Sequence, residues 1–125
     1  MKRRGIILID HGSRRAEANA ALETMASYLE AALGGGLVVA FAHMELAPPS
    51  LFEAARALVE DGVRDIVVFP YFLSDGRHVS EDIPQQMEEA AAAFPGSRFR
   101  LLGPLGPDRE LAALIARRIL AADET

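Results

Sequence analysis

The sequence of 125 residues contains no cysteine. This absence excludes disulfide bonds, thiolate nucleophiles and sulfur ligands for a metal ion. It is in keeping with a reducing cytoplasm, which is the location we expect. Any metal must therefore be held by nitrogen and oxygen atoms.

Long apolar runs and an excess of positive charge are also missing. The basic start, residues 1–4, is like the beginning of a signal peptide, but the apolar run behind it covers only residues 6–9. That run is too short to cross a membrane. The 13 Lys and Arg against 18 Asp and Glu give a net charge of −5, whereas nucleic-acid binding needs clustered basic side chains. We therefore expect neither a membrane nor a nucleic acid as a partner.

The chain has the length of one domain, and half of its residues are hydrophobic, so we expect a single domain over residues 1–125. Four short apolar runs each precede an amphipathic stretch. The runs predict strands at residues 5–9, 37–41, 66–69 and 99–102. The stretches predict helices over residues 15–33 and 51–59, then from Ile83 to Phe94 and from Leu111 to Ile119.

Signals at the helix ends support these predictions. Ser50 followed by Glu53 is typical of a capping box, and Asp108 is typical of an N-cap. Pro84 fits the first turn of a helix, where no backbone donor is lost. The three glycines at residues 34–36 mark the end of the first helix.

Alternating strands and helices predict an α/β fold, in which a parallel sheet is covered by helices on both faces. The order 2-1-3-4 puts two helices on each face, giving a three-layer α/β/α arrangement of flavodoxin-like topology. Strands 1 and 3 then flank the switch point, where ligands of such sheets bind beside the carboxyl ends of the strands.

All three histidines follow predicted strands at that edge. His11 comes after the first strand, His43 after the second and His78 after the third, with Glu45 close behind His43. A single loop histidine is usually an ordinary polar surface residue, but the convergence of three favours a site. Imidazoles and a carboxylate suit divalent Co, Ni, Fe or Zn and leave coordination positions open for a substrate.

Three motifs in these loops resemble those of the small CbiX/SirB-type sirohydrochlorin chelatases. They are His-Gly-Ser-Arg at residues 11–14, Glu-Leu-Ala-Pro-Pro-Ser-Leu at residues 45–51, and Pro-Tyr-Phe-Leu-Ser-Asp-Gly-Arg-His at residues 70–78, continued by Asp-Ile-Pro at residues 82–84. The resemblance spans nearly the whole chain. It implies the chelatase-like α/β/α fold and the insertion of a divalent metal into sirohydrochlorin during cobalamin or sirohaem biosynthesis.

The resemblance assigns roles to residues of these motifs. His11, His78 and Glu45 are implied to bind the metal and to be catalytic. The metal is a substrate, with Co²⁺ our first choice and Fe²⁺ or Ni²⁺ the alternatives, and we expect no permanently bound cofactor. The residues expected to contact the anionic tetrapyrrole are Ser13, Arg14, Tyr71, Phe72, Leu73, Gly76 and Arg77. The arginines could equally be solvated charges, and the apolar members could belong to the core.

Two further expectations follow from the resemblance. Where an aromatic residue commonly stands two positions before the glutamate, this sequence has His43. We interpret it slightly more readily as a polar residue that leans toward solvent or packs at the cleft wall than as an extra ligand. Longer relatives carry two such domains in tandem, so a chain with one domain is expected to form a homodimer around the tetrapyrrole.

Other functions stay open at this level. A metal carrier or a tetrapyrrole-binding protein would hold the same ligands without catalysis. A histidine phosphatase also places His-Gly after its first strand, but it has Arg where this chain has Asp10. A phosphate-binding flavodoxin-like module would leave His78 and Glu45 without a role.

Overall fold

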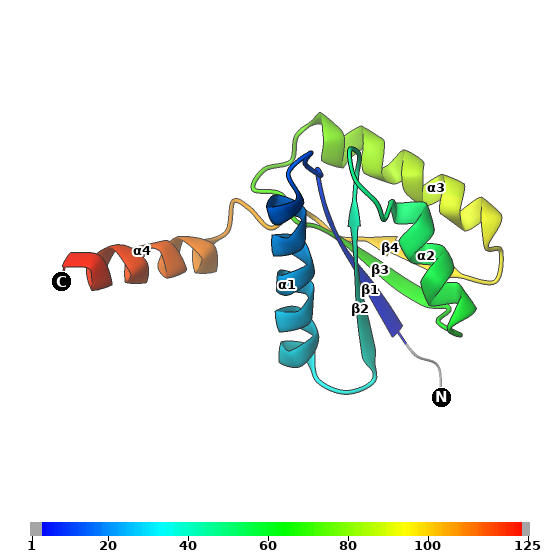
Figure 1. Ribbon diagram of the computed structural model, residues 1–125, viewed down its shortest axis with the longest axis horizontal. Helices are drawn as coiled ribbons and strands as arrows, with labels where there is room; N and C mark the ends of the chain where they lie inside the picture. The colour runs from blue at the N-terminus through cyan, green and yellow to red at the C-terminus, as the bar shows by residue number, and fades with distance from the viewer. Residues whose placement is uncertain (1–3, 124–125) are drawn as a thin grey trace.

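A computed structural model describes residues 4–123, and the side chain of His78 lies outside the described part. Its centre is a parallel sheet of four strands in the order β2-β1-β3-β4 (Figure 1), as the sequence predicts. The strands are β1 (Arg4–Asp10), β2 (Leu37–His43), β3 (Asp65–Pro70) and β4 (Arg98–Leu101). β2 runs two residues further than expected, so His43 ends a strand instead of following one.

Helices cover the two faces unequally. The elements are α1 (Ala16–Leu33), α2 (Leu51–Glu60), the π-helical turn η1 (His78–Asp82), α3 (Ile83–Ala93) and α4 (Arg109–Asp123). α1 packs on one face of the sheet, and α2 and α3 pack on the other. α4 projects away from the sheet (Figure 1), so the prediction of two helices on each face is wrong. The apolar spacing that predicts this helix does not specify which surface receives its apolar side.

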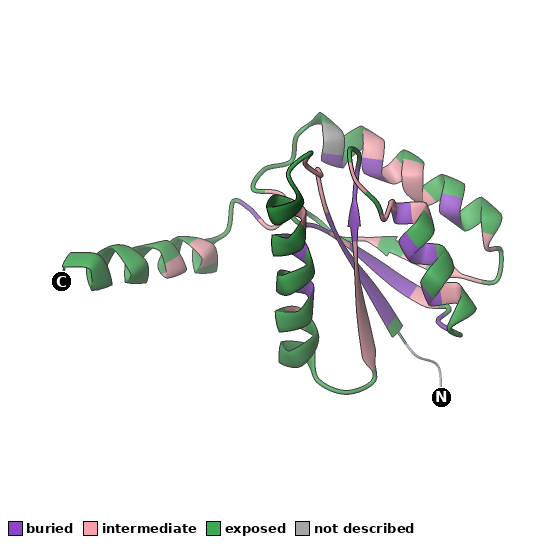
Figure 2. Cartoon of the chain, in the orientation of Figure 1, coloured by how far each residue is buried: buried purple, intermediate pink, exposed green. Residues whose placement is uncertain are grey.

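The buried residues follow the same asymmetry (Figure 2). On the side of α2 and α3, alternate strand residues such as Ile7, Ile9 and Ile66 are fully buried against Leu51 and Ile83. The side of α1 has a smaller core, whose buried members are Leu8, Leu22 and Ala26. A parallel sheet needs cover on both faces, and here one face is only half covered.

The predicted helix caps are present. The Ser50 side chain accepts a hydrogen bond from Glu53 N at 3.1 Å, and the Glu53 carboxylate accepts one from Ser50 N at 2.9 Å. Asp108 Oδ1 accepts from Glu110 N and Leu111 N at 2.8 and 3.2 Å. No helix within residues 4–123 is long and apolar enough to span a bilayer.

The capping box at α2 gives a first prediction. Hydrogen bonds from Ser50 lower the pKa of the Glu53 carboxyl, and Ser50→Ala removes the side-chain half of the box. We expect the free energy of unfolding in urea to fall by about 1 kcal/mol. Thr24→Ala, on the exposed side of α1, should leave it unchanged or slightly higher, because Thr24 bonds only to Ala20 O in its own helix. Equal losses in the two variants would contradict this account.

Candidate metal site

The loops that follow β1 and β2 are hydrogen-bonded to each other beyond the ends of the strands. Met44 N donates to Asp10 O at 2.8 Å, and Glu45 N donates to His11 O at 3.1 Å. On the other side of β1, Tyr71 N donates to Ile9 O at 2.7 Å. The parallel pairing therefore extends into the loops and places Glu45 beside His11.

The side chains of His11 and Glu45 meet at the carboxyl edge of the sheet. His11 Nε2 lies 3.0 Å from Glu45 Oε1, and the two side chains are 42% and 52% exposed. His11 Nδ1 lies 3.3 Å from the carbonyl oxygen of Gly12 in its own loop. An imidazole nitrogen and a carboxylate oxygen thus stand together at an accessible edge, and both are ligands that a divalent metal accepts.

Gly12 makes this approach of the two loops possible. Its φ is +93°, and a Cβ built on it would lie 1.9 Å from Glu45 O. Any other residue would therefore collide with the backbone that carries Glu45. The neighbouring loop thus occupies the space that a side chain at residue 12 would need.

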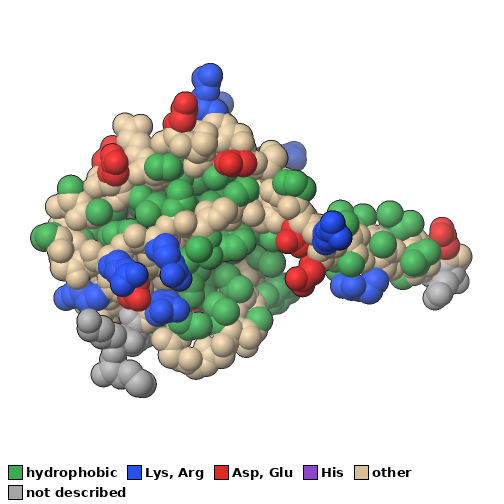
Figure 3. Space-filling view, turned by 180° about the vertical axis from the view of Figure 1, so that it is seen from behind, with side chains coloured by type: hydrophobic (Ala, Val, Ile, Leu, Met, Phe, Trp, Pro, Cys, Tyr) green, Lys and Arg blue, Asp and Glu red, His purple; other side chains and the backbone are tan. Residues whose placement is uncertain are grey.

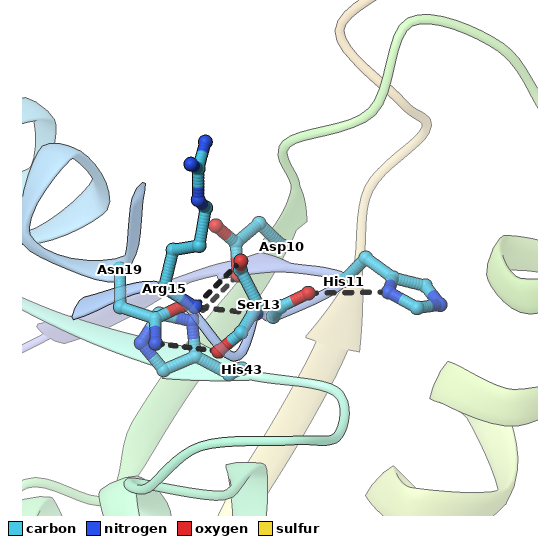
Figure 4. Close-up of polar contacts among 7 residues, drawn as sticks. Asp10, His11, Ser13, Arg15, Asn19 and His43 are labelled. Carbon is cyan, nitrogen blue, oxygen red and sulfur yellow. Dashed lines mark hydrogen bonds and ion pairs between the residues drawn. The ribbon is translucent and has the colours of Figure 1, made fainter. Parts of the chain in front are cut away.

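Hydrogen bonds to the start of α1 fix the loop that follows β1 (Figure 4). Asn19 Nδ2 donates to Ser13 O at 2.7 Å, and Asn19 Oδ1 accepts from Ser13 N at 3.0 Å. The Ser13 hydroxyl accepts from Arg15 N at 3.0 Å, where α1 begins. The predicted substrate contact Ser13 is thus engaged in the loop itself. Sequence reasoning missed Asn19, although an Asn in the first turn of a helix after a functional loop is a signal for such a bond.

His43 lies inside the protein. Its side chain is 1% exposed, and its Nδ1 lies 2.6 Å from Asp10 Oδ1. The His43 ring also meets Phe41 edge to face, with centroids 5.9 Å apart. In Figure 4 the labelled His11 ring points away from this pair. The expectation that His43 leans toward solvent is therefore wrong, because its ring is enclosed and paired with Asp10. The Asp10–His43 pair supports the loop that carries His11.

Loss of this pair gives a second prediction. His43→Ala leaves a cavity and a partly buried Asp10 without its partner, so we expect the protein to lose about 2–3 kcal/mol of stability. The order of affinities for Co²⁺, Ni²⁺ and Fe²⁺ should not change, because His43 does not face the His11–Glu45 edge. Urea unfolding and metal titrations measure the two effects. A reordered metal series would instead make His43 a ligand.

The loop after β3 supplies the other predicted residues. Gly76 O accepts hydrogen bonds from Val79 N and Ser80 N at 3.1 and 3.0 Å, and this turn leads into η1, whose first residue is His78. Irregular π-helical turns occur frequently at functional sites. The side chain of His78 lies outside the described part, so the pairing of its imidazole with His11 stays a prediction.

The expected substrate residues fall into two groups. Phe72 packs against the main core, whereas Leu73 is 68% exposed and Tyr71 is 36% exposed. Arg14 is exposed, and Arg77 is an exposed residue whose Nε lies 3.7 Å from Glu81 Oε2. Phe72 is therefore mainly a core residue, and the other four remain accessible to a ligand.

An acidic groove of about 320 Å³ adjoins Glu45. Its lining residues are Met44, Glu45, Asp82, Gln85, Gln86 and Glu89. Gln86 Nε2 donates to Met44 O at 3.2 Å and so ties α3 to the loop that carries Glu45. Carboxylates along a groove concentrate cations near the site.

The fold and the site define an open α/β protein with flavodoxin-like strand order, whose histidine and carboxylate meet at the carboxyl edge next to the switch point. Comparison with known families agrees with this class. The CbiX family model matches residues 5–122. The chain belongs to the CbiX family.

Its curated relatives are named either sirohydrochlorin ferrochelatase or sirohydrochlorin cobaltochelatase. A chloroplastic sirohydrochlorin ferrochelatase from Arabidopsis thaliana is 42% identical over 92% of this chain and 51% of its own length. A sirohydrochlorin cobaltochelatase from Sulfurisphaera tokodaii is 30% identical over 92% of this chain and 90% of its own length. The chain thus spans about half of the first relative and nearly all of the second.

Similar solved structures also include one chain of about the same length and one of about twice the length. A structure described as a cobalamin (vitamin B12) biosynthesis CbiX protein from Marinobacter aquaeolei matches with a TM-score of 0.82 and 32% identity, over 97% of this chain and 98% of the other. The sirohydrochlorin chelatase SirB from Bacillus subtilis subspecies spizizenii, in complex with cobalt, matches with a TM-score of 0.85 and 26% identity, over 95% of this chain but 50% of the other.

Proposed function

We propose that this protein is a sirohydrochlorin chelatase, which inserts a divalent metal ion into sirohydrochlorin on a route to cobalamin or sirohaem. The observation that carries the proposal is the His11–Glu45 pair, 3.0 Å apart at an accessible sheet edge. The family and the names of the relatives supply the reaction class.

Each member of the site has a role in this reaction. His11 and His78 bind the incoming metal through imidazole nitrogen, and Glu45 supplies a carboxylate oxygen as the third ligand. Insertion also removes two protons from the pyrrole nitrogens. A carboxylate or an imidazole that releases the metal to the macrocycle is then free to accept a proton.

The tetrapyrrole is anionic, whereas the chain carries a net charge of −5. Local cations must therefore bind its carboxylates, and we assign this role to Arg14 and Arg77, which lie in the chain close to His11 and His78. The exposed Tyr71 and Leu73 offer apolar surface to the macrocycle. No neighbouring atom lies within 4 Å of the Cβ position of Gly76, so the space beside this turn is open to the substrate.

Cobalt is our first choice of metal, with iron and nickel as alternatives. A cobaltochelatase of nearly the same length supports this choice, as does a solved SirB structure that holds cobalt. A plant ferrochelatase and a SirB structure with Fe³⁺ keep iron as a candidate. A site of nitrogen and oxygen donors accepts all three ions.

We further propose that two copies of the chain complete the cleft. The SirB chain that binds cobalt is twice as long as the part this chain matches. A symmetric pair of single domains would supply the same surface from two copies.

The test of the function is anaerobic mixing of the purified protein with sirohydrochlorin and Co²⁺, Ni²⁺ or Fe²⁺ in turn, followed by absorbance. We expect insertion of at least one metal to be faster than without protein, and fastest for Co²⁺. Binding of sirohydrochlorin without any acceleration would instead indicate a tetrapyrrole or metal carrier and would overturn the proposal.

A further inference from the structure

The side chains of Asp10 and His43 join the two strands that lead to the proposed metal ligands. Asp10 ends β1 and directly precedes His11. His43 ends β2 and stands two residues before Glu45. Asp10 and His43 are partners in the register of β1 with β2, so their side chains lie on the same face of the sheet. One hydrogen bond, 2.6 Å long, thus links the two ligand-bearing loops where each leaves the sheet.

This hydrogen bond is short and directional. A carboxylate oxygen accepts hydrogen bonds, so His43 Nδ1 is the donor and Asp10 Oδ1 the acceptor. Bonds from an imidazole N–H to a carboxylate are roughly twice as strong as bonds between neutral groups. The side chains of His43 and Asp10 are 1% and 23% exposed. Water therefore has little access to the donor end of the bond.

The His43 ring has a fixed place beneath the loop that follows β1. Its Cβ lies 3.1 Å from the position of a Cβ on Gly12, and the ring meets Phe41 edge to face. The backbone is held as well, because His43 N donates to Pro49 O at 2.8 Å. Of the residues that the structure describes, none contributes a histidine side chain to the surface seen in Figure 3. The ring is therefore held in one orientation beside Asp10.

The proposed ligands, in contrast, lie at the surface. The side chains of His11 and Glu45 are 42% and 52% exposed. Two backbone hydrogen bonds join their loops, one to Asp10 O and one to His11 O. These bonds follow the Asp10–His43 pair directly in the chain. The distance between the two ligands therefore depends on how closely the pair holds the two strand ends together.

We propose that the Asp10–His43 pair is a positioning element of the metal site, which keeps His11 and Glu45 close enough to share one ion without contacting the ion itself. The inference rests on the proposed function only in taking His11 and Glu45 as metal ligands. Without the pair, the ends of β1 and β2 can separate, and both ligands move. The affinity for every divalent ion then falls, whereas the order of affinities stays as the ligands set it.

The first test separates positioning from stability with two substitutions of His43. His43→Phe keeps a ring in the buried space but removes the donor to Asp10, so we expect Co²⁺ affinity to fall about tenfold. His43→Asn leaves part of the space empty but keeps an N–H donor two bonds from Cβ, as Nδ1 is. It should bind Co²⁺ within about threefold of the unmodified chain, although it is less stable in urea.

The measurement is a Co²⁺ titration followed by visible absorbance, without sirohydrochlorin and under conditions in which each variant is folded. A purely structural role of His43 predicts the opposite pattern, with tight binding in His43→Phe and weak binding in His43→Asn. That result would overturn the proposal.

A double variant tests whether Asp10 and His43 act as one unit. Asp10→Ala should weaken Co²⁺ binding about as much as His43→Phe, and the two together should cost about tenfold instead of about a hundredfold. Val63→Ala is the control, because it opens space in the core just before β3, at the opposite edge of the sheet. It should lower stability and leave Co²⁺ affinity unchanged. Additive losses from Asp10→Ala and His43→Phe would contradict a shared action.

Amide hydrogen exchange tests the same inference without any metal. Glu45 N donates to His11 O, so exchange of this amide reports whether the two loops stay joined. Relative to the amides of α2, exchange at Glu45 should be at least about tenfold faster in His43→Phe and Asp10→Ala and unchanged in His43→Asn. Slow exchange in the first two variants would refute the positioning role. The expected pattern in a chain that binds Co²⁺ without inserting it would support the positioning role and refute only the chelatase function.

Discussion

Replacing His11 by alanine is expected to slow metal insertion into sirohydrochlorin by about a hundredfold or more. The substitution removes the imidazole that lies 3.0 Å from the Glu45 carboxylate, and with it one proposed metal ligand. The fold should survive, because the His11 side chain is 42% exposed and contributes little to the core. Anaerobic absorbance assays with Co²⁺ measure the rate, and circular dichroism checks the fold.

Three companion variants sharpen this result. His78→Ala should cause a loss of similar size if both imidazoles hold the metal. Glu45→Gln keeps the shape of the side chain but removes its charge, so it should reduce the rate by about tenfold or more. Glu17→Gln, an exposed carboxylate in the first turn of α1, is the matched control and should leave the rate unchanged. Full activity of His11→Ala with a normal fold would exclude His11 from the reaction.

Substituting alanine for Gly12 is expected to damage both the fold and the site. The new Cβ would lie 1.9 Å from Glu45 O, and the φ of +93° would strain the backbone even without that collision. Together the strain and the overlap should cost about 3–5 kcal/mol of stability. The loop must move to relieve the overlap, so His11 and Glu45 would separate and the insertion rate would fall with them.

Gly62 offers a control that isolates the collision. Its φ is +91°, nearly that of Gly12, but nothing lies within 4 Å of its Cβ position. Gly62→Ala should therefore cost only the backbone strain, about 1–2 kcal/mol, and leave metal insertion unchanged. Urea unfolding and the absorbance assay measure both variants. Equal stability losses at the two glycines would show that the contact between the loops is not the cause.

Much of the fold could be predicted because its signals are local. Continuous apolar runs marked the strands, and the alternation of strand and helix fixed a parallel sheet. Ser50 with Glu53, and Asp108, set the starts of two helices through bonds to residues only two or three positions away. From these elements the gathering of the loops at one edge also followed, and the expected strand order is the one observed.

The roles of side chains whose partners are distant in the sequence could not be predicted from local signals. His11 and His43 look alike in the sequence, as histidines at strand ends. The register of β1 with β2 turns His43 inward onto Asp10 and leaves His11 beside Glu45. Apart from the family resemblance of residues 11–14, no local pattern distinguishes these two positions.

The sequence by itself determined the elements of this protein and the edge at which its histidines gather, because the elements depend on neighbouring residues and the carboxyl ends of parallel strands lie at one edge. Only the tertiary structure decided that His11 meets Glu45, that His43 is buried with Asp10, and that α4 leaves its own sheet. These depend on register and on a linker packed against a remote loop, and such contacts exist only once the chain has folded.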